Sequence, residues 1–107
     1  MASSDEVAHA ELRALVGDDD SVELRPMFGT LAALVDGHVF AVAMGEVIGV
    51  KLGADALAEL DALPGSGILT MGTRHMKAYR SLPSGMPSAE RRAWLARARE
   101  HVAGRHR

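Results

Sequence analysis

The histidines are the first residues of this sequence to consider for chemistry, because imidazole serves both as a general base and as a metal ligand. There are five of them: His9, His38, His75, His101 and His106. No two stand four residues apart, the spacing that places two ligands on one helix face. His75, Met76 and Met71 have the soft donors of a copper site, but no cysteine and no second histidine stand beside them. The sequence therefore predicts no metal site, and we expect the methionines to fill the core.

Acidic and nucleophilic residues also lack the arrangements that catalysis needs. The run Asp18–Asp20 has neither the alternating ligands nor the distal glutamate of a calcium loop. The glycine-rich segment 65–67 follows an expected helix and precedes an expected strand, the reverse of the order in a phosphate-binding loop. No serine stands at a strand-to-helix elbow, and the absence of cysteine removes thiol nucleophiles and disulfides. We therefore expect neither an enzyme nor a cofactor.

The charged residues are divided unequally along the chain. Residues 1–61 hold 12 acidic and 3 basic side chains, whereas residues 62–107 hold 2 acidic and 9 basic ones. We expect the two halves to neutralise each other in the folded protein, since their charges nearly cancel. The alternative is weak nucleic-acid binding, in which Arg92, Arg97 and Arg99 would contact phosphates. We expect Trp94 to be buried, which leaves Tyr79 alone as a stacking ring and weakens that alternative.

The length of 107 residues and a hydrophobic content of 48% fit one globular domain spanning the chain. No apolar run is long enough to cross a membrane, and the polar first residues do not form a signal peptide, so we expect a cytoplasmic protein.

Hydrophobic periodicity predicts the elements that must position these residues. The expected order is a helix ending at Gly17, strands 22–28, 31–35, 38–44 and 47–52, a helix 54–63, strands 68–71 and 76–82, and a helix 88–103. Pro26 confines its strand to an edge, and Asp36-Gly37 indicates a tight hairpin. Gly49 predicts a bulge or close packing. The fold class is α+β, a two-layer sandwich with an antiparallel sheet and helices on one face, ordered α-β(3)-α-β(2)-α or with a fourth strand in the first run.

Several segments of the chain together form a recognisable pattern. They are Met27-Phe28-Gly29, the stretch 35–41 with its Val-Asp-Gly turn, Val50-Lys51-Leu52, the helix 54–63, the segment 76–79 and the closing helix around Trp94. Over about residues 22–104 the chain resembles the N-terminal domain of TfoX/Sxy, the bacterial competence regulators. Thr30 stands where that family often has a glycine, and Tyr79 where it often has a tryptophan. YjbR-like proteins are the nearest alternative.

The resemblance implies a secretion-chaperone-like fold and supplies no catalytic residues. The family-motif residues are Met27, Phe28, Gly29, Asp36, Gly37, Lys51, Met76 and Tyr79. We interpret Phe28 as a core residue and Gly29 as a bend. We expect a small non-enzymatic module with a regulatory or protein-interaction role, which binds a protein partner or itself. The alternatives are the nucleic-acid binding described above and a small-molecule or enzymatic role in a pocket between sheet and helices.

Overall fold

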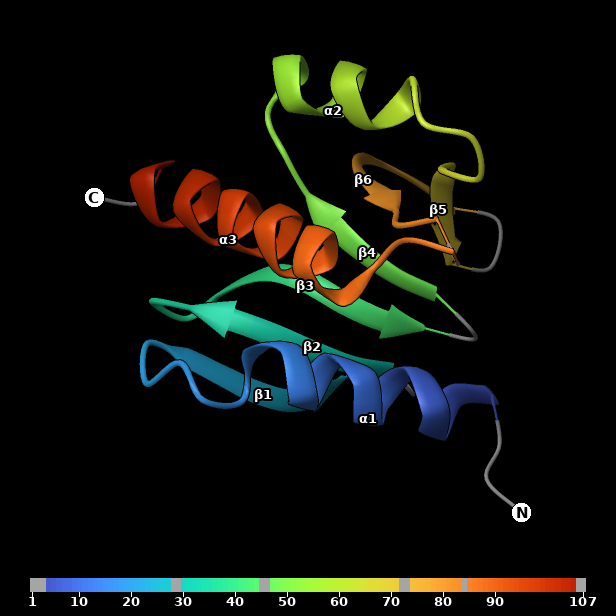
Figure 1. Ribbon diagram of the computed structural model, residues 1–107. Coiled ribbons are helices and arrows are strands. Elements are labelled where there is room, and N and C mark those ends of the chain that lie inside the picture. Colours follow the sequence, from blue (N-terminus) through green and yellow to red (C-terminus); the bar gives the residue numbers. More distant parts are fainter. Residues whose placement is uncertain (1–3, 28–29, 45–46, 72–73, 84, 106–107) are drawn as a thin grey trace.

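The computed structural model describes residues 4–27, 30–44, 47–71, 74–83 and 85–105, which form three helices and one six-stranded antiparallel sheet (Figure 1). In chain order the elements are α1 (Ser4–Val16), β1 (Val22–Met27), β2 (Thr30–Val35), β3 (His38–Met44), β4 (Val47–Lys51), α2 (Ala54–Asp61), β5 (Ile68–Met71), β6 (Arg74–Ser81) and α3 (Ser88–Arg105). The expected α+β class is confirmed, with four strands between α1 and α2.

The strands follow the order β1-β2-β3-β4-β6-β5 across the sheet. The chain leaves β4 through α2 and returns so that β6, the later strand, pairs with β4. This crossover places β1 and β5 at the two edges. Pro26 lies in β1, as its missing N–H group predicted, because an edge strand has a side that needs no ladder hydrogen bonds.

The turn between β2 and β3 has the tight hairpin geometry that its residues predicted. Asp36 has a φ of +52° and Gly37 a φ of +80°, and Val35 pairs directly with His38. A two-residue turn with positive φ at both positions matches the twist of the strands that it joins. The turn therefore fixes the register of β2 and β3, which both contribute buried residues to the main core.

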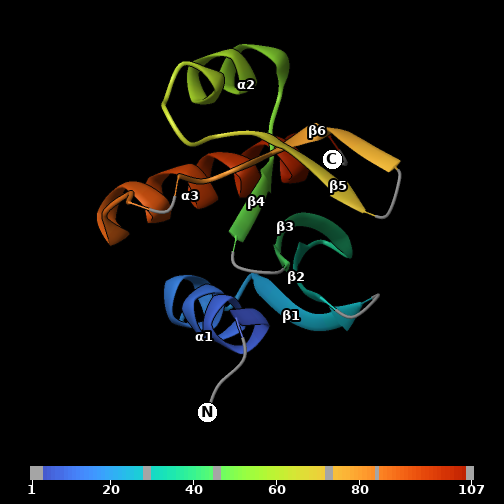
Figure 2. The same ribbon diagram turned by 90° about the vertical axis from the view of Figure 1, so that its right-hand side faces the viewer.

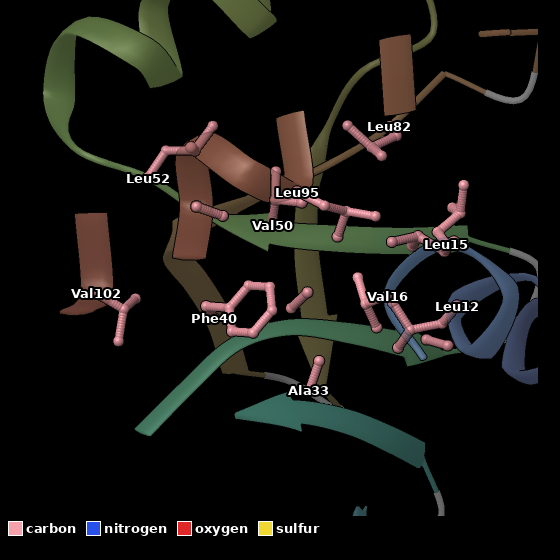
Figure 3. Packing of buried hydrophobic residues seen from close by; sticks show 14 of the residues in the cluster. Leu12, Leu15, Val16, Ala33, Phe40, Val50, Leu52, Leu82, Leu95 and Val102 are labelled. Atoms are coloured by element: carbon pink, nitrogen blue, oxygen red, sulfur yellow. The ribbon is translucent and has the colours of Figure 1, made fainter. Parts of the chain in front are cut away.

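The main core lies between the sheet and the helices, and we call it the helix-side cluster. Its fully buried centre is Phe40 of β3, which Figure 3 shows between β3 and the side chains of α3. The helices contribute buried residues at helical spacing: Leu12, Leu15 and Val16 from α1, Leu60 from α2, and Leu95, Ala98 and Val102 from α3. All three helices thus bury apolar side chains against one face of the sheet.

The opposite face of the sheet carries a second apolar cluster, and we call this side the open face. Its buried centre is Ala32, Leu34, Val42 and Leu69, surrounded by the half-buried side chains of Val39, Met44, Val47, Met76 and Tyr79. None of the three described helices contributes to it, and Figure 2 shows α1 and α3 on the other side of the sheet. The β5–β6 hairpin curls toward this side, so strand residues alone bury the cluster.

Candidate interaction surfaces

Three of the family-motif residues come together on the open face. Lys51 of β4 and Tyr79 of β6 are directly opposed in the sheet register. Met76 and Tyr79 both pack against the second cluster. Lys51 and Tyr79 are far apart in sequence, and the crossover that pairs β6 with β4 brings them side by side. The open face is therefore the place where the motif residues of the later strands meet.

The other motif residues do not share this position. Asp36 and Gly37 form the exposed β2–β3 turn at an end of the sheet. Met27 is the last residue of β1 and pairs with Thr30. Phe28 and Gly29 lie outside the described residues, so our interpretation of Phe28 as a core residue stays a prediction. The motif thus divides into turn residues and a group on the open face.

The polar chemistry of the open face comes from one phenol and one ammonium group. Tyr79 is half-buried, and this burial raises the pKa of its phenol above the usual 10.0 because water no longer stabilises the phenolate. Lys51 forms no ion pair with any carboxylate in the described part of the chain. The face therefore combines a half-buried apolar surface with a cation that no described carboxylate neutralises.

An ion pair lies at the edge of the open face that β1 forms. Val22 and Leu24 of β1 pack against the helix-side cluster. Since side chains alternate along a strand, Glu23 and Arg25 point to the other side. There they form an ion pair with each other, and both side chains are about half exposed. This edge is thus polar and neutral, in contrast to the centre of the face.

The arginines proposed as phosphate contacts mostly have acidic partners within the protein. Arg97 forms an ion pair with Glu59 of α2, and Nε of Arg99 lies 3.3 Å from Oδ2 of Asp19. Arg92 is exposed and forms no ion pair with a described residue. Two of the three arginines predicted to contact phosphates are therefore held by carboxylates of the same domain. The three arginines do not form an isolated basic patch.

Further ion pairs join the same two halves of the sequence. Nε of Arg80 lies 2.6 Å from Oδ1 of Asp61, and Arg91 binds Glu11. Together with the pairs of Arg97 and Arg99, these contacts all connect a basic residue after position 61 with an acidic residue before position 62. The expected neutralisation of one half by the other is confirmed at these four places. Part of the divided charge of the sequence is therefore an internal complementarity.

Arg91 is the residue of this network that sequence reasoning missed. It is only 7% exposed. Its guanidinium binds Glu11 of α1 and donates hydrogen bonds of 2.9 Å to the carbonyl oxygens of Met86 and Pro83. Its position next to the exposed Arg92 gave no signal, because in a helix neighbouring residues point in different directions. Arg91 fixes the start of α3 to α1 and to the preceding loop.

The expected burial of Trp94 holds only in part. Its ring packs against the helix-side cluster but is only partly buried. The guanidinium carbon of Arg97 lies 4.5 Å from the ring centroid, a cation–π distance. Arg97 therefore covers the ring from the solvent side, and the same arginine binds Glu59.

The described residues lack the cluster of side chains that metal binding requires. Among them, no three His, Cys, Asp or Glu side chains are close enough to hold a metal ion. The pKa of Asp19 is lowered, chiefly by the hydrogen bond from the Ser21 hydroxyl and then by the Ser21 N–H group, with Arg99 contributing less.

No helix among the described residues is long and apolar enough to cross a membrane.

One feature of the sequence indicates the second cluster, although the alternation of apolar and polar residues does not. Leu31–Val35 is an unbroken apolar run, and strands with apolar residues on both faces are buried on both sides. The open face could therefore have been inferred from this run, although its contact with β5 could not.

The comparisons with known proteins give one match. The family model of the TfoX N-terminal domain matches residues 14–102, from the end of α1 through nearly all of α3. No match was found among curated proteins or among solved structures. The matched region contains every strand of the sheet and the interfaces between α3 and the core. The resemblance carried by Met27-Phe28-Gly29 and the Val-Asp-Gly turn is thereby confirmed, and the chain belongs to the TfoX N-terminal domain family.

Proposed function

We propose that this protein is a non-enzymatic regulatory module that acts by binding another protein through the open face of its sheet. The observation that carries the proposal is the second apolar cluster, whose half-buried border is formed by Val39, Met44, Val47, Met76 and Tyr79. Apolar side chains that stay partly accessible and lie close together are typical of protein-interaction sites. Family membership supports a regulatory role, since the family is named after competence regulators.

The composition of this border also supports a protein partner. Methionine is flexible and adapts to the shape of a partner, and tyrosine supplies a large apolar surface with a polar end. Met44, Met76 and Tyr79 are all on the border of the second cluster. Aromatic residues and methionine are enriched at protein interfaces relative to the rest of the surface. The border therefore has the composition of the centre of an interface.

The ammonium of Lys51, which pairs with no described carboxylate, specifies the chemistry of the partner. Lys51 is opposite Tyr79 in the register and thus beside the apolar border. A partner that places apolar side chains on Met76 and a carboxylate near Lys51 would satisfy both features. In a twofold contact centred on Lys51, a second copy of this chain would place two ammonium groups near each other, which is unfavourable. We therefore propose a different protein with an apolar and acidic contact surface.

The test starts from capture and ends with purified components. A protein captured on the immobilised chain is identified, produced separately and titrated against the wild type and two variants. Met76→Glu places a charge in the apolar border, and Lys51→Glu reverses the cation. We expect each variant to weaken binding by about tenfold or more, as for residues at the centre of an interface.

A matched control separates the face from general effects of charge. Ala58→Glu adds the same negative charge on an exposed position of α2, on the helix side of the molecule, and should leave the affinity unchanged. Circular dichroism must show that all variants are folded. Equal binding by wild type and Met76→Glu contradicts the proposal, and so does a wild-type homodimer that Met76→Glu dissociates.

A further inference from the structure

Met76 and Tyr79 of β6 lie on the same side of the sheet although they stand three residues apart. Side chains alternate between the two faces of a regular strand, so residues at positions i and i+3 point in opposite directions. Here both side chains pack against the second cluster on the open face. A regular β6 would direct one of them toward the helices, so the strand must be irregular between the two residues.

The pairing of β6 with β5 locates this irregularity. Leu69 pairs with Met76, whereas Ile68, the residue before Leu69, pairs with Arg80. Residues 77–79 therefore have no partner in β5 and form a bulge in β6. A bulge bends its strand and re-aims side chains. This bulge accounts for the curl of the β5–β6 hairpin toward the open face.

The bulge leaves two carbonyl groups of β6 without a partner in β5. The carbonyl oxygen of Ala78 points toward β4, where it accepts a hydrogen bond of 3.1 Å from the N–H group of Leu52. Backbone groups of neighbouring residues in a strand point to opposite sides, so the carbonyl groups of Lys77 and Tyr79 point toward β5. No residue of β5 pairs with them there. These two oxygens need a donor from elsewhere.

The side chain of Arg80 supplies this donor. Its Nη1 atom donates hydrogen bonds to the carbonyl oxygens of Lys77 and Tyr79, at 2.9 and 2.8 Å. Its Nε atom donates to Oδ1 of Asp61, the last residue of α2, at 2.6 Å. The side chain of Arg80 is only 13% exposed. One guanidinium group thus satisfies the bulge and is itself oriented by a carboxylate of α2.

We propose that Arg80 is the positioning residue of the open face. By holding the bulge, it places Met76 and Tyr79 on one side of the sheet, and Asp61 holds Arg80 in the required orientation. Without the guanidinium group, both carbonyl oxygens would lose their donor, and a regular strand that pairs fully with β5 would become favourable. The consequence for partner binding rests on the proposed function, whereas the placement of the two side chains does not.

The test uses Arg80→Lys, which keeps the charge but lacks the planar set of donors that reaches three acceptors. Nuclear Overhauser effects from the Tyr79 ring and the Met76 methyl group to the methyl groups of the second cluster are measured in the isotopically labelled protein. The wild type should show both sets of contacts, and Arg80→Lys should lose one of them. The raised pKa of the Tyr79 phenol should then fall toward 10.0, because the ring becomes more accessible to water.

A matched control comes from the neighbouring ion pair of the same helix. The described partners of Arg97 are Glu59 and Trp94, which both belong to helices, so Arg97→Lys should leave the contacts of the open face unchanged. Asp61→Asn removes the anion that orients Arg80 and should weaken the same contacts as Arg80→Lys. The side chain of Asp61 is 47% exposed, so this change should not prevent folding.

Circular dichroism must show that each variant is folded, and Asp61→Asn decides by the same criterion if Arg80→Lys does not fold. Both sets of contacts retained in folded Arg80→Lys, or one set lost equally in Arg97→Lys, would overturn the proposal.

The binding assay of the preceding subsection separates this proposal from the proposed function. Arg80→Lys should weaken the affinity for the captured protein by about tenfold, as Met76→Glu does. Weakened binding by Met76→Glu with wild-type binding by Arg80→Lys would contradict the positioning role and leave the proposed function intact. Equal binding by wild type and Met76→Glu would contradict the proposed function, and the contacts of Met76 and Tyr79 would then decide alone whether Arg80 positions them.

Discussion

Leu69 of β5 lies directly over Gly49 of β4, although β6 separates their strands in the sheet. A Cβ atom on Gly49 would be 2.0 Å from Cδ1 of Leu69, far inside van der Waals contact. The close packing predicted for this glycine is therefore confirmed, and its physical reason is the curl of the β5–β6 hairpin over the open face. Gly49 leaves the space that Leu69 fills.

We expect Gly49→Ala to lower the free energy of unfolding by about 1–3 kcal/mol, since the added methyl group overpacks the second cluster. Denaturant unfolding measures this loss. Leu69→Ala removes the clashing atoms, so the double variant Gly49→Ala/Leu69→Ala should be more stable than the sum of the two single changes predicts. Strict additivity would contradict a direct contact between the two positions.

Arg91 should be the arginine whose removal destabilises the protein most. Arg91→Ala leaves Glu11 and the carbonyl oxygens of Met86 and Pro83 without their donor, so we expect a loss of about 2–4 kcal/mol in the free energy of unfolding. Arg91→Lys should restore little, because an ammonium group lacks the planar arrangement of donors that reaches three acceptors. Arg92→Ala, at an exposed position, should change stability by less than about 0.5 kcal/mol in the same measurement.

Tyr79 is the only tyrosine of the chain, so ultraviolet absorbance reports its ionisation alone. Burial raises the pKa of Tyr79 above 10.0, which means that the unfolded chain loses this proton at a lower pH than the folded one. The contribution to stability is therefore intact below pH 10 and decreases as the pH rises further. Tyr79→Phe should make unfolding less sensitive to pH in this range. Ionisation of Tyr79 at the usual value would contradict its burial.

The ion pairs of Arg97 and Arg99 lead to a prediction about nucleic-acid binding. We expect no binding of labelled random-sequence duplex DNA at physiological salt, measured by fluorescence anisotropy, because these cations already face Glu59 and Asp19. Glu59→Gln together with Asp19→Asn frees both arginines and should increase binding at low salt. Micromolar binding by the wild type with a steep salt dependence, abolished by changing Arg92, Arg97 and Arg99 to glutamate, would instead assign the arginines to phosphate contacts.

Local patterns predicted the local structure well. The Asp36-Gly37 turn and the edge position of Pro26 each depend on backbone geometry that one or two residues determine, whereas Gly49 predicted close packing without indicating Leu69 as its neighbour. The pairing of β6 with β4 depends on a crossover through α2, and no single segment contains that information. For the same reason the meeting of Lys51 with Tyr79 could not be derived from their spacing.

The surfaces were predicted less completely than the fold. The balance of charge between the halves indicated mutual neutralisation, but not which residues form pairs. Arg91 is buried while Arg92 beside it is exposed, and only the packing of α3 on α1 distinguishes them. Trp94 was expected in the core, whereas the position of α3 leaves its ring at the border under Arg97. Side chains at element boundaries depend on how elements are placed, which periodicity does not describe.

The four ion pairs join the acidic half of the chain to the basic half. Cleavage between the two halves would therefore leave two fragments of opposite charge. A cut in the segment Pro64–Gly67 would release a polyanionic fragment of charge −9 and a polycationic fragment of charge +7, each carrying one side of the helix-side cluster. Opposite charges accelerate encounter, and salt screens them. The fragments would therefore reassemble as a split protein does, at a rate controlled by ionic strength, with α3 completing the core.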